Sequence, residues 1–398
     1  MKPLDFRVPG FLFSGISAGI KKDGRRDLGL IYSEIPAQVA GLFTTNAVKA
    51  APVQLDIRRI RGGSCQAVVV NSGNANACTG LAGLRNAEAV SRGIAKALRI
   101  NPSRVLVSST GVIGVPFPAK KIEDGIPELV RDLSPDGFMK AVEAIMTTDT
   151  FPKVEAASCR IGGRQLKLCG MIKGAGMIRP NVATMLSFLM TDATISAPLL
   201  QRMLAKAAEG SYNRITVDGD MSTNDTVLLL ANGKAGLPSI HRMDRDGGLF
   251  QSMLSEVCEH LTRSLVKDGE GATKLIEIEV RGARTPDDAK RAAYAIAHSP
   301  LVKTAFFGED ANWGRILCAL GYSGARINPN QIDVFFDRSP IVKDGMGVGG
   351  RLEERAARVI KKQSFKVTVD LHQGKHRFSV LTTDLSLEYV KINASYRS

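Results

Sequence analysis

Apolar residues along this chain follow two alternating patterns: short runs rich in β-branched residues, and longer segments with an apolar position every three or four residues. Residues 66–70 and 104–108 are of the first kind and predict strands, whereas residues 85–98 have the spacing of an amphipathic helix. Each of the two strands runs into a polar loop of turn-forming residues. This alternation predicts an α/β fold in which loops gather at the ends of strands, where functional sites tend to lie.

The same two patterns continue toward the C-terminus. Residues 275–280 alternate apolar and acidic side chains, as expected for a strand with one exposed face, and residues 286–298 begin with the Pro-Asp-Asp sequence of a helix start. A domain boundary is expected near residues 184–197. Further strands are predicted at residues 185–190, 214–217, 226–230, 332–336, 365–369 and 377–381, and further helices at residues 198–209, 249–266 and 351–362.

A glycine-rich loop runs into the apolar run at residues 185–190 and delivers a hydroxyl to the junction. The loop is Lys173-Gly-Ala-Gly-Met-Ile-Arg-Pro-Asn-Val, and Ala183 and Thr184 follow it. A threonine hydroxyl is a weak nucleophile that needs a base, and a backbone cut before Thr184 would provide one as the freed α-amine. The more common role of a threonine here is to open a strand and satisfy a turn. These residues alone leave both interpretations open.

The composition is that of a soluble globular protein with one large domain or two. Of the 398 residues, 44% are hydrophobic and 23% are charged. The first residues lack the pattern of a secretory signal and no apolar run is long enough to span a bilayer, so we expect a cytoplasmic protein outside the membrane. The six cysteines form no CxxC pair, which is typical of free thiols in a reducing compartment, and we expect Cys318 in the core.

The net charge of +14 raises the question of a nucleic-acid partner. The basic residues are scattered, however, and no aromatic residues interleave with them to stack on bases. We therefore expect no nucleic-acid binding. The charge is better explained as a basic surface that suits anionic small molecules.

Three motifs that could hold a cofactor or a metal have weak support. Gly345-Met-Gly-Val-Gly-Gly350 matches the dinucleotide-binding pattern, but no predicted strand directly precedes it, so we interpret it as a turn. His372 and His376 lack a carboxylate in a metal-site pattern. The acidic loop at residues 218–225 lacks the closing glutamate of a calcium-binding loop, since Leu229 occupies that place. We expect neither a metal nor a resident cofactor.

Three other features suit acyl chemistry. Ser108-Ser-Thr-Gly-Val-Ile-Gly114 brings a hydroxyl and a flexible backbone N–H together at a strand end, as an oxyanion hole requires. Glu270 lies between two glycines that allow a ligand to approach; its carboxylate suits an ammonium group, although a solvated turn acid explains it equally well. Residues 389–398 have a strand-like pattern almost to the end of the chain, which predicts a tail that is held in place.

With these residues in their order, the chain closely resembles the ornithine acetyltransferase (glutamate N-acetyltransferase) family of arginine biosynthesis, essentially from end to end. The motifs that carry the resemblance are Asn71-Ser-Gly-Asn-Ala-Asn76, Ser109-Thr-Gly111, Met146-Thr-Thr-Asp-Thr-Phe-Pro-Lys153, Lys173-Gly-Ala-Gly-Met177, Pro180-Asn-Val-Ala-Thr-Met-Leu186, Ser222-Thr-Asn-Asp-Thr226, Asp268-Gly-Glu-Gly-Ala-Thr273 and Val390-Lys-Ile-Asn393.

The resemblance implies an ornithine acetyltransferase-like α/β fold of two lobes, with mixed sheets and helices packed on them. It also implies that the precursor cuts itself between Ala183 and Thr184 into an α-chain, residues 1–183, and a β-chain, residues 184–398, which assemble as an α2β2 heterotetramer. Thr184 would be the nucleophile, and Thr110 with Gly111 would form the oxyanion hole. The positions that match the family's substrate contacts are Thr147, Lys173, Thr184, Glu270, Asn393 and Ser398.

The implied reaction moves the acetyl group of N2-acetylornithine to glutamate through an acetyl ester of Thr184. Whether acetyl-CoA is a second acetyl donor, which would make the enzyme bifunctional, stays open because no CoA-binding motif is visible. Ala175, Arg179 and Val182 depart from the residues common in the family's loop before the cut. Two alternatives remain: an amidase or aminopeptidase that uses Thr184 with water as the acceptor, and a basic binding protein without enzymatic activity.

Overall fold

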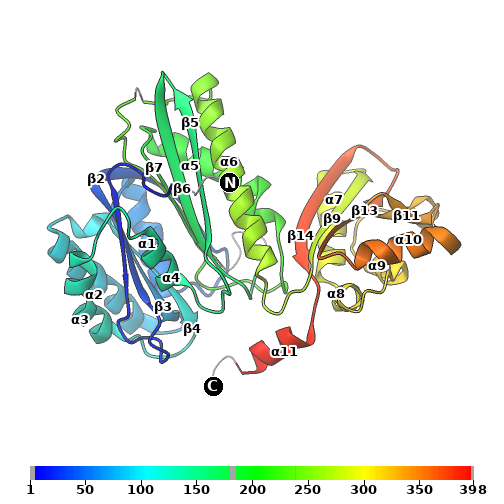
Figure 1. Ribbon diagram of the computed structural model, residues 1–398, viewed down its shortest axis with the longest axis horizontal. Coiled ribbons are helices and arrows are strands. Elements are labelled where there is room, and N and C mark those ends of the chain that lie inside the picture. The colour runs from blue at the N-terminus through cyan, green and yellow to red at the C-terminus, as the bar shows by residue number, and fades with distance from the viewer. Residues whose placement is uncertain (1–4, 180–184, 238, 396–398) are drawn as a thin grey trace. The chain divides into compact units, whose positions relative to one another are not determined.

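The computed structural model describes residues 5–179, 185–237 and 239–395 of the chain (Figure 1). The chain divides into two compact units. The first comprises Met1–Asn213 and Asp220–Leu265, and the second comprises Arg214–Gly219 and Val266–Ser398. Each unit has its own sheet and its own hydrophobic core, and each is described here by itself.

A mixed sheet forms the frame of the first unit. Within the described residues its order is β4-β3-β2-β8-β7-β6-β5, and β1 pairs with β2. The pairs β3/β4 and β7/β8 are parallel, and the other neighbours are antiparallel. The strands are β1 (Phe11–Ile16), β2 (Leu28–Phe43), β3 (Ser64–Asn74), β4 (Val105–Val112), β5 (Lys153–Ile161), β6 (Arg164–Lys173), β7 (Leu186–Thr191) and β8 (Thr226–Ala231).

Strand β2 is long enough to serve both halves of this sheet. Its N-terminal part pairs with β3 and its C-terminal part with β8, and the register shifts between Tyr32 and Ala37. In a flat sheet, the five spacings from β4 to β6 would separate these strands by about 24 Å. Yet Lys173 at the end of β6 donates a hydrogen bond to Thr110 in β4 at 3.0 Å. The sheet therefore curls until the ends of its two halves meet.

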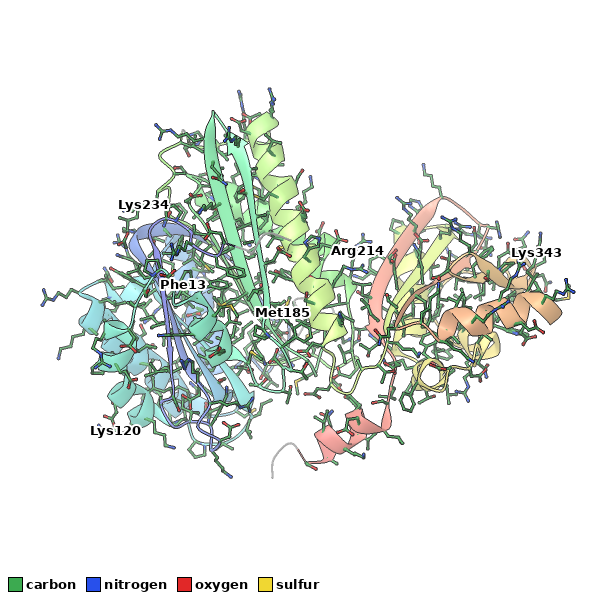
Figure 2. All side chains as sticks on the ribbon, in the orientation of Figure 1. Phe13, Lys120, Met185, Arg214, Lys234 and Lys343 are labelled. Carbon is green, nitrogen blue, oxygen red and sulfur yellow. The ribbon has the colours of Figure 1, made fainter. Side chains whose placement is uncertain are left out.

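Strand β3 is buried on both faces, which explains its continuous apolar run. Val68 and Val70 pack in one core with helix α4, whereas Ala67 and Val69 pack in another with α2 and α3. Figure 2 shows Phe13 among the packed side chains of this unit and Lys120 at its edge, where its side chain is 82% exposed. The helices of the unit are α1 (Ala51–Arg59), α2 (Gly80–Leu98), α3 (Ala119–Arg131), α4 (Phe138–Ile145), α5 (Ala197–Gly210) and α6 (Arg245–Lys267).

The second unit has a smaller mixed sheet with the order β12-β11-β10-β13-β9-β14. Strand β9 alternates buried and half-buried residues, as predicted for a strand with one exposed face, and it runs parallel to β13. The strands are β9 (Leu275–Ala283), β10 (Asp333–Phe336), β11 (Ser339–Lys343), β12 (Met346–Gly347), β13 (Ser364–Asp370) and β14 (His376–Thr383). The helices are α7 (Pro286–His298), α8 (Pro300–Phe307), α9 (Trp313–Gly321), α10 (Gly350–Ile360) and α11 (Leu387–Ala394).

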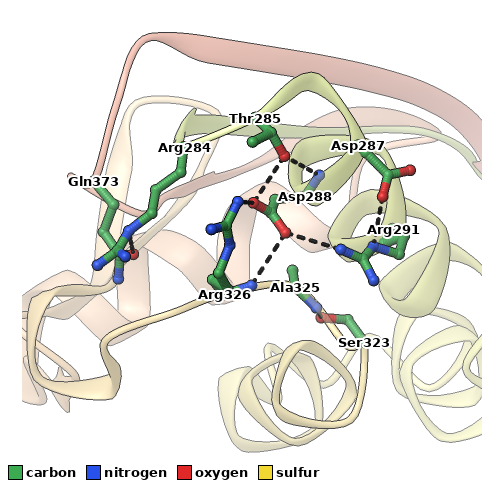
Figure 3. Close-up of polar contacts among 9 residues, drawn as sticks. All are labelled: Arg284, Thr285, Asp287, Asp288, Arg291, Ser323, Ala325, Arg326 and Gln373. Carbon is green, nitrogen blue, oxygen red and sulfur yellow. Dashed lines mark hydrogen bonds and ion pairs between the residues drawn. The ribbon is translucent and has the colours of Figure 1, made fainter.

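A buried carboxylate, Asp288, fixes the start of helix α7 (Figure 3). Thr285 caps the helix by accepting a hydrogen bond from Asp288 N, and its hydroxyl donates to the Asp288 carboxylate at 2.8 Å. Arg291 and Arg326 also donate to this carboxylate, at 3.0 and 3.3 Å. The Thr285 hydrogen bond, with the contacts from Arg326, holds the pKa of Asp288 below its usual range despite the burial. This acid is therefore a structural anchor whose oxygens are already satisfied.

The structure confirms the α/β class with mixed sheets and two units, and helix α7 has the predicted bounds. The boundary expected near residues 184–197 does not divide the units, because this segment lies within the first unit. The predicted strand at residues 214–217 is wrong: Tyr212–Arg214 is a 3-10 helix, and only Ile215 forms a β-bridge, to Leu381. The loop predicted after residue 70 is also partly wrong, because β3 continues to Asn74. Among the described helices, none is long and apolar enough to cross a membrane.

Two further predictions near the C-terminus fail for identifiable reasons. The tail that was predicted to be strand-like forms helix α11 instead. Ser386 caps the first turn of this helix by accepting a hydrogen bond from Tyr389 N. Cys318 lies on helix α9 as predicted but is exposed, because Ile316 and Leu320 occupy the buried face of that helix. The cut between Ala183 and Thr184 concerns the covalent chain, not the two compact units, and remains a prediction.

Candidate active site

The junction that the sequence singled out leads into a fixed, buried strand. Ala183 and Thr184 themselves lie outside the described residues. Met185, labelled in Figure 2, is 2% exposed, and its carbonyl accepts a hydrogen bond from Thr226 N at 3.0 Å. All six residues of β7 are buried, and Leu186 pairs with Lys173 of β6. The residue after Thr184 is thus held in place, close to Lys173.

The predicted oxyanion residues, Thr110 and Gly111, lie at the end of β4. Thr110 pairs with Ser72, and Gly111 pairs with Gly73, next to an irregularity in the register of β3. Gly111 has φ +131°, and a Cβ atom there would lie 2.3 Å from the backbone carbon of Gly73. This position therefore requires glycine, since any side chain would push the two strands apart. The close approach keeps the Gly111 backbone beside the Thr110 hydroxyl.

Hydrogen bonds of asparagine side chains hold this strand end in place. Ser109 donates its hydroxyl proton to Asn71 Oδ1 at 2.6 Å, and Asn71 Nδ2 donates to Asn74 O at 2.8 Å. Asn74 in turn donates to Pro116 O at 3.0 Å and accepts from Asn76 N at 2.8 Å. These contacts satisfy polar groups that are buried, as a folded core requires. The Asn71–Asn76 motif is therefore the scaffold of the oxyanion residues.

A buried cation adjoins the oxyanion threonine. Lys173 is 5% exposed, and its Nζ atom donates a hydrogen bond to Thr110 Oγ1 at 3.0 Å. Because Thr110 Oγ1 accepts from Lys173, its own proton can be donated to another acceptor. Donors of this kind stabilise negative charge that develops on a carbonyl oxygen, and they do so most strongly where water is excluded.

The positive charge of Lys173 has a buried counter-charge, Asp149. The Oδ1 atom of Asp149 accepts hydrogen bonds from Gly174 N, at 2.8 Å, and from Lys153 Nζ. Its Oδ2 atom accepts from Thr147 N at 2.8 Å. Burial acts to raise the pKa of Asp149, but the charges of Lys173 and Lys153 outweigh it and hold this pKa well below the usual range. Asp149 is therefore an anion that interacts with two of the predicted substrate contacts: it accepts a hydrogen bond from the backbone of Thr147, and it balances the charge of Lys173.

The remaining described substrate contacts, Glu270 and Asn393, belong to the second unit. Glu270 is 9% exposed, and its Oε2 atom accepts a hydrogen bond from Asn393 Nδ2 at 2.9 Å. Asn393 lies on α11 and also donates to Tyr389 O at 3.0 Å. The structure therefore confirms that the tail is held in place, by a helix and not by a strand. Ser398 lies outside the described residues.

The two glycines beside Glu270 have a packing role. Gly271 has φ +64°, and a Cβ atom there would lie 2.5 Å from Tyr389 N. Ser386 donates its hydroxyl proton to Gly271 O at 2.6 Å, which joins the Glu270 loop to the start of α11. A solvated turn acid would not need such contacts. Glu270 is instead a nearly buried carboxylate at a built position.

Sequence reasoning found six of these residues through the family motifs but missed the importance of Asp149. A single aspartate in a polar segment has no spacing that marks it as a counter-ion. The lysine four residues later, Lys153, was the available signal. Within the described residues, no group of three or more histidine, cysteine or acidic side chains could hold a metal ion.

The chain is similar in sequence to known proteins over nearly its whole length. The model of the ArgJ family matches residues 12–398. The arginine biosynthesis bifunctional protein ArgJ of Geobacter sulfurreducens is 53% identical over 391 residues, which cover 98% of this chain and 100% of that protein. Its counterpart from Thermotoga neapolitana is 46% identical over 395 residues, which cover 98% of this chain and 99% of that protein.

Two solved structures are also similar. The crystal structure of the arginine biosynthesis bifunctional protein from Bacillus halodurans is 42% identical with a TM-score of 0.50, and the match covers 52% of this chain and 98% of that chain. The ornithine acetyltransferase of Mycobacterium tuberculosis, solved in complex with ornithine, is 36% identical with a TM-score of 0.40. That match covers 44% of this chain and 94% of that chain.

Proposed function

The chain belongs to the ArgJ family, and from this premise we propose how its residues carry out acetyl transfer. It is an acyltransferase of arginine biosynthesis that moves the acetyl group of N2-acetylornithine to glutamate. The observation that carries the mechanism is the buried contact between Lys173 and Thr110 at 3.0 Å, because Lys173 also pairs with Leu186, the first residue of β7 and two residues after Thr184.

In the first half of the reaction, Thr184 Oγ attacks the acetyl carbonyl carbon of N2-acetylornithine. The hydroxyl proton passes to the free α-amine of Thr184, and the carbonyl oxygen becomes an oxyanion that accepts from the Thr110 hydroxyl and the Gly111 N–H. The C–N bond then breaks, the proton passes to the leaving amine, and ornithine departs. An acetyl ester of Thr184 remains.

In the second half, the neutral amine of glutamate attacks this ester. The α-amine of Thr184 takes up the proton that the attacking nitrogen loses, and it returns a proton to Oγ as the ester bond breaks. N-acetylglutamate leaves and the free threonine is restored. Because both halves pass through the same type of tetrahedral oxyanion, Thr110, Gly111 and the nearby charge of Lys173 serve both.

We propose that the nucleophile forms by self-cleavage. Thr184 Oγ would attack the carbonyl carbon of Ala183 and pass its proton to the peptide nitrogen; the C–N bond would break as the ester to Oγ forms, which frees the α-amine of Thr184. Water would then hydrolyse that ester to the carboxylate of Ala183 and the hydroxyl of Thr184. The lengths of the relatives support this proposal. Curated relatives match this chain over 98% of its length, whereas the Bacillus halodurans chain, itself covered to 98%, corresponds to only 52% of it. A solved chain of half the length fits an α-chain or a β-chain.

The substrate contacts follow from charge. Lys173 suits a substrate carboxylate in addition to its contact with Thr110, and Glu270 suits the side-chain ammonium group of the ornithine moiety. Thr147, Asn393 and Ser398 complete the set by their match to the family motifs.

Three further properties belong to the same proposal. The relatives are named bifunctional, which supports acetyl-CoA as a second acetyl donor to glutamate. The α- and β-chains are proposed to assemble as an α2β2 heterotetramer. A cytoplasmic location is supported by six cysteines that are all free thiols in the structure, as is typical of a reducing compartment.

Trapping the acetyl ester tests this mechanism. Purified enzyme is incubated with N2-acetylornithine without glutamate, and the β-chain is analysed by peptide mass spectrometry. We expect one added acetyl group on Thr184, which disappears when glutamate is supplied and reappears as N-acetylglutamate. If the enzyme without glutamate releases free acetate as fast as it transfers acetyl to glutamate, it is instead an amidase. Failure to label Thr184 while transfer proceeds would refute the covalent intermediate.

A further inference from the structure

The segment that leads into β8 is buried although all of its side chains are polar. Ser222, Thr223, Asn224, Asp225 and Thr226 are all between 1% and 8% exposed. Buried polar side chains persist where they hold specific partners. None of these five residues has a role in the chemistry described above, so their contacts call for an explanation.

Asn224 binds the strand that carries the oxyanion residues. Its Nδ2 atom donates hydrogen bonds to Ser109 O, at 2.8 Å, and to Ala75 O, at 2.7 Å. The Thr223 hydroxyl donates to Asn224 Oδ1 at 2.6 Å, which fixes the orientation of the amide. Ser109 directly precedes Thr110, so this contact sets the position of the oxyanion residues relative to the start of β8.

Asp225 binds Met185, the residue between the nucleophile and strand β7. Its Oδ1 atom accepts a hydrogen bond from Met185 N at 3.2 Å, and the neighbouring Thr226 N donates to Met185 O at 3.0 Å. Met185 is therefore held on both sides of its backbone. Asp225 is 1% exposed, and its Oδ2 atom has no hydrogen-bond partner among the described residues.

Burial raises the pKa of Asp225 well above its usual range, although the Met185 N–H and the charge of Lys173 act against this. An asparagine amide would have nearly the same shape and would keep an acceptor oxygen for Met185 N.

We propose that Asn224 and Asp225, here called the Asn224–Asp225 clamp, are positioning residues that fix Met185, the residue after the nucleophile, relative to the strand end that carries the oxyanion residues. The inference rests on the proposed function. Strands β4 and β7 are separated by three strands in the sheet, so no ladder of backbone hydrogen bonds connects their ends directly. Two adjacent side chains make that connection, one to Ser109 and one to Met185.

The clamp acts through geometry, which determines its effect on rate. A misplacement of about 1 Å between reacting groups lowers a catalytic rate by about 10²-fold. We therefore expect Asp225→Ala to slow both self-cleavage and kcat by about 10²-fold, with a much smaller change in KM. Asn224→Ala is expected to lower kcat similarly, because Ser109 O loses its donor. Asp225→Asn keeps an acceptor oxygen for Met185 N and is expected to stay within about tenfold of the wild type.

A matched control lies at the other end of β7. Asp192 is 2% exposed and accepts a hydrogen bond from Lys167 N at 2.8 Å, so it makes the same kind of contact away from the junction. Asp192→Ala is expected to lower thermal stability as Asp225→Ala does, while cleaving and turning over at the wild-type rate.

The experiment measures self-cleavage by intact mass over time, kcat and KM for acetyl transfer, and thermal unfolding, for Asp225→Ala, Asp225→Asn, Asn224→Ala and Asp192→Ala. Three results would each overturn the clamp. They are wild-type rates of self-cleavage and turnover in Asp225→Ala, a loss of these rates in Asp192→Ala as large as in Asp225→Ala, and rates in Asp225→Asn as low as in Asp225→Ala. If Asp225→Ala fails to fold, Asp225→Asn and Asn224→Ala still decide the question. Thr184→Ala is measured alongside: cleavage or transfer by that variant would refute the proposed function itself, whatever the clamp variants do.

Discussion

Replacing Asp149 by asparagine tests the electrostatic core of the site. The carboxylate binds Gly174 N, Thr147 N and Lys153, and it balances the charge of Lys173. An asparagine side chain fits the same space but carries no charge. It also turns one acceptor atom into a donor, so one of the three N–H groups that faces the carboxylate would meet another N–H group.

The magnitude follows from the burial of the pair. The side chains of Asp149 and Lys153 are both 0% exposed, so water cannot replace the lost partner. Removing one member of a buried ion pair costs about 3–5 kcal/mol of unfolding free energy, because it leaves an uncompensated charge. Lys173, which loses its counter-charge in the same change, should release its proton more easily. The alkaline limb of the rate profile is expected to move to lower pH.

The assay combines unfolding in urea with acetyl transfer measured between pH 6 and pH 10. Asp288→Asn is the control, because Asp288 is also a buried acid that binds arginine side chains and one backbone N–H, that of Arg326, but in the second unit (Figure 3). We expect the control to lower stability while leaving kcat and its pH profile unchanged. The two variants together separate loss of stability from loss of charge at the site.

Two results would contradict this reasoning. An Asp149→Asn enzyme with wild-type unfolding free energy would show that the carboxylate is not the counter-ion of the buried lysines. A variant with lower kcat but an unchanged alkaline limb would show that the charge of Lys173 does not depend on Asp149.

Three other predictions follow from the structure. Gly111→Ala forces a Cβ atom to 2.3 Å from Gly73, so kcat should fall by at least about 10²-fold; an active variant would refute the oxyanion assignment. Glu270→Gln keeps the acceptor for Asn393 but removes the charge, so KM for N2-acetylornithine should rise about tenfold with kcat little changed, and an unchanged KM would refute the ammonium contact. Burial lowers the pKa of Lys303 to about 7, and the unfolded chain therefore binds one more proton than the folded chain above that pH. Stability should rise between pH 7 and 8.5 by up to about 1.4 kcal/mol per unit relative to Lys303→Met; parallel curves for the two proteins would contradict this.

Strand β3 shows what the sequence could predict and where it misled. Residues 66–70 form an apolar run because both faces of the strand are buried, and that pattern is readable. The strand continues through Ser72-Gly-Asn74, which resembles a turn by composition. These polar residues remain in the strand because their side chains bind other parts of the fold, as Ser72 Oγ does with Ala144 O at 2.6 Å. The local sequence does not indicate a partner that lies 72 residues away along the chain.

The C-terminal segment failed for a different reason. Val390 and Ile392 alternate with polar residues, which suggested a strand, but the helix signals Ser386 and Glu388 at its start outweigh that short alternation. Asn393, a predicted substrate contact on this helix, was singled out through the family motif and not through its secondary structure.

The assembly of the first unit's site could not be predicted from spacing at all. Thr110 and Lys173 are 63 residues apart and belong to strands separated by four others in the sheet. Their contact depends on the curl of that sheet. Motifs identified the residues, but only the fold shows that the lysine adjoins the oxyanion threonine and that Asp149 balances its charge.

In the proposed mechanism the nucleophile exists only after the chain has cut itself before Thr184. Intact mass spectrometry of the purified wild type and of Thr184→Ala measures this cut. We expect two wild-type chains, residues 1–183 and 184–398, with a free threonine at the start of the second, and a single inactive chain for the variant. A wild-type protein that remains one chain and still transfers acetyl to glutamate would contradict it.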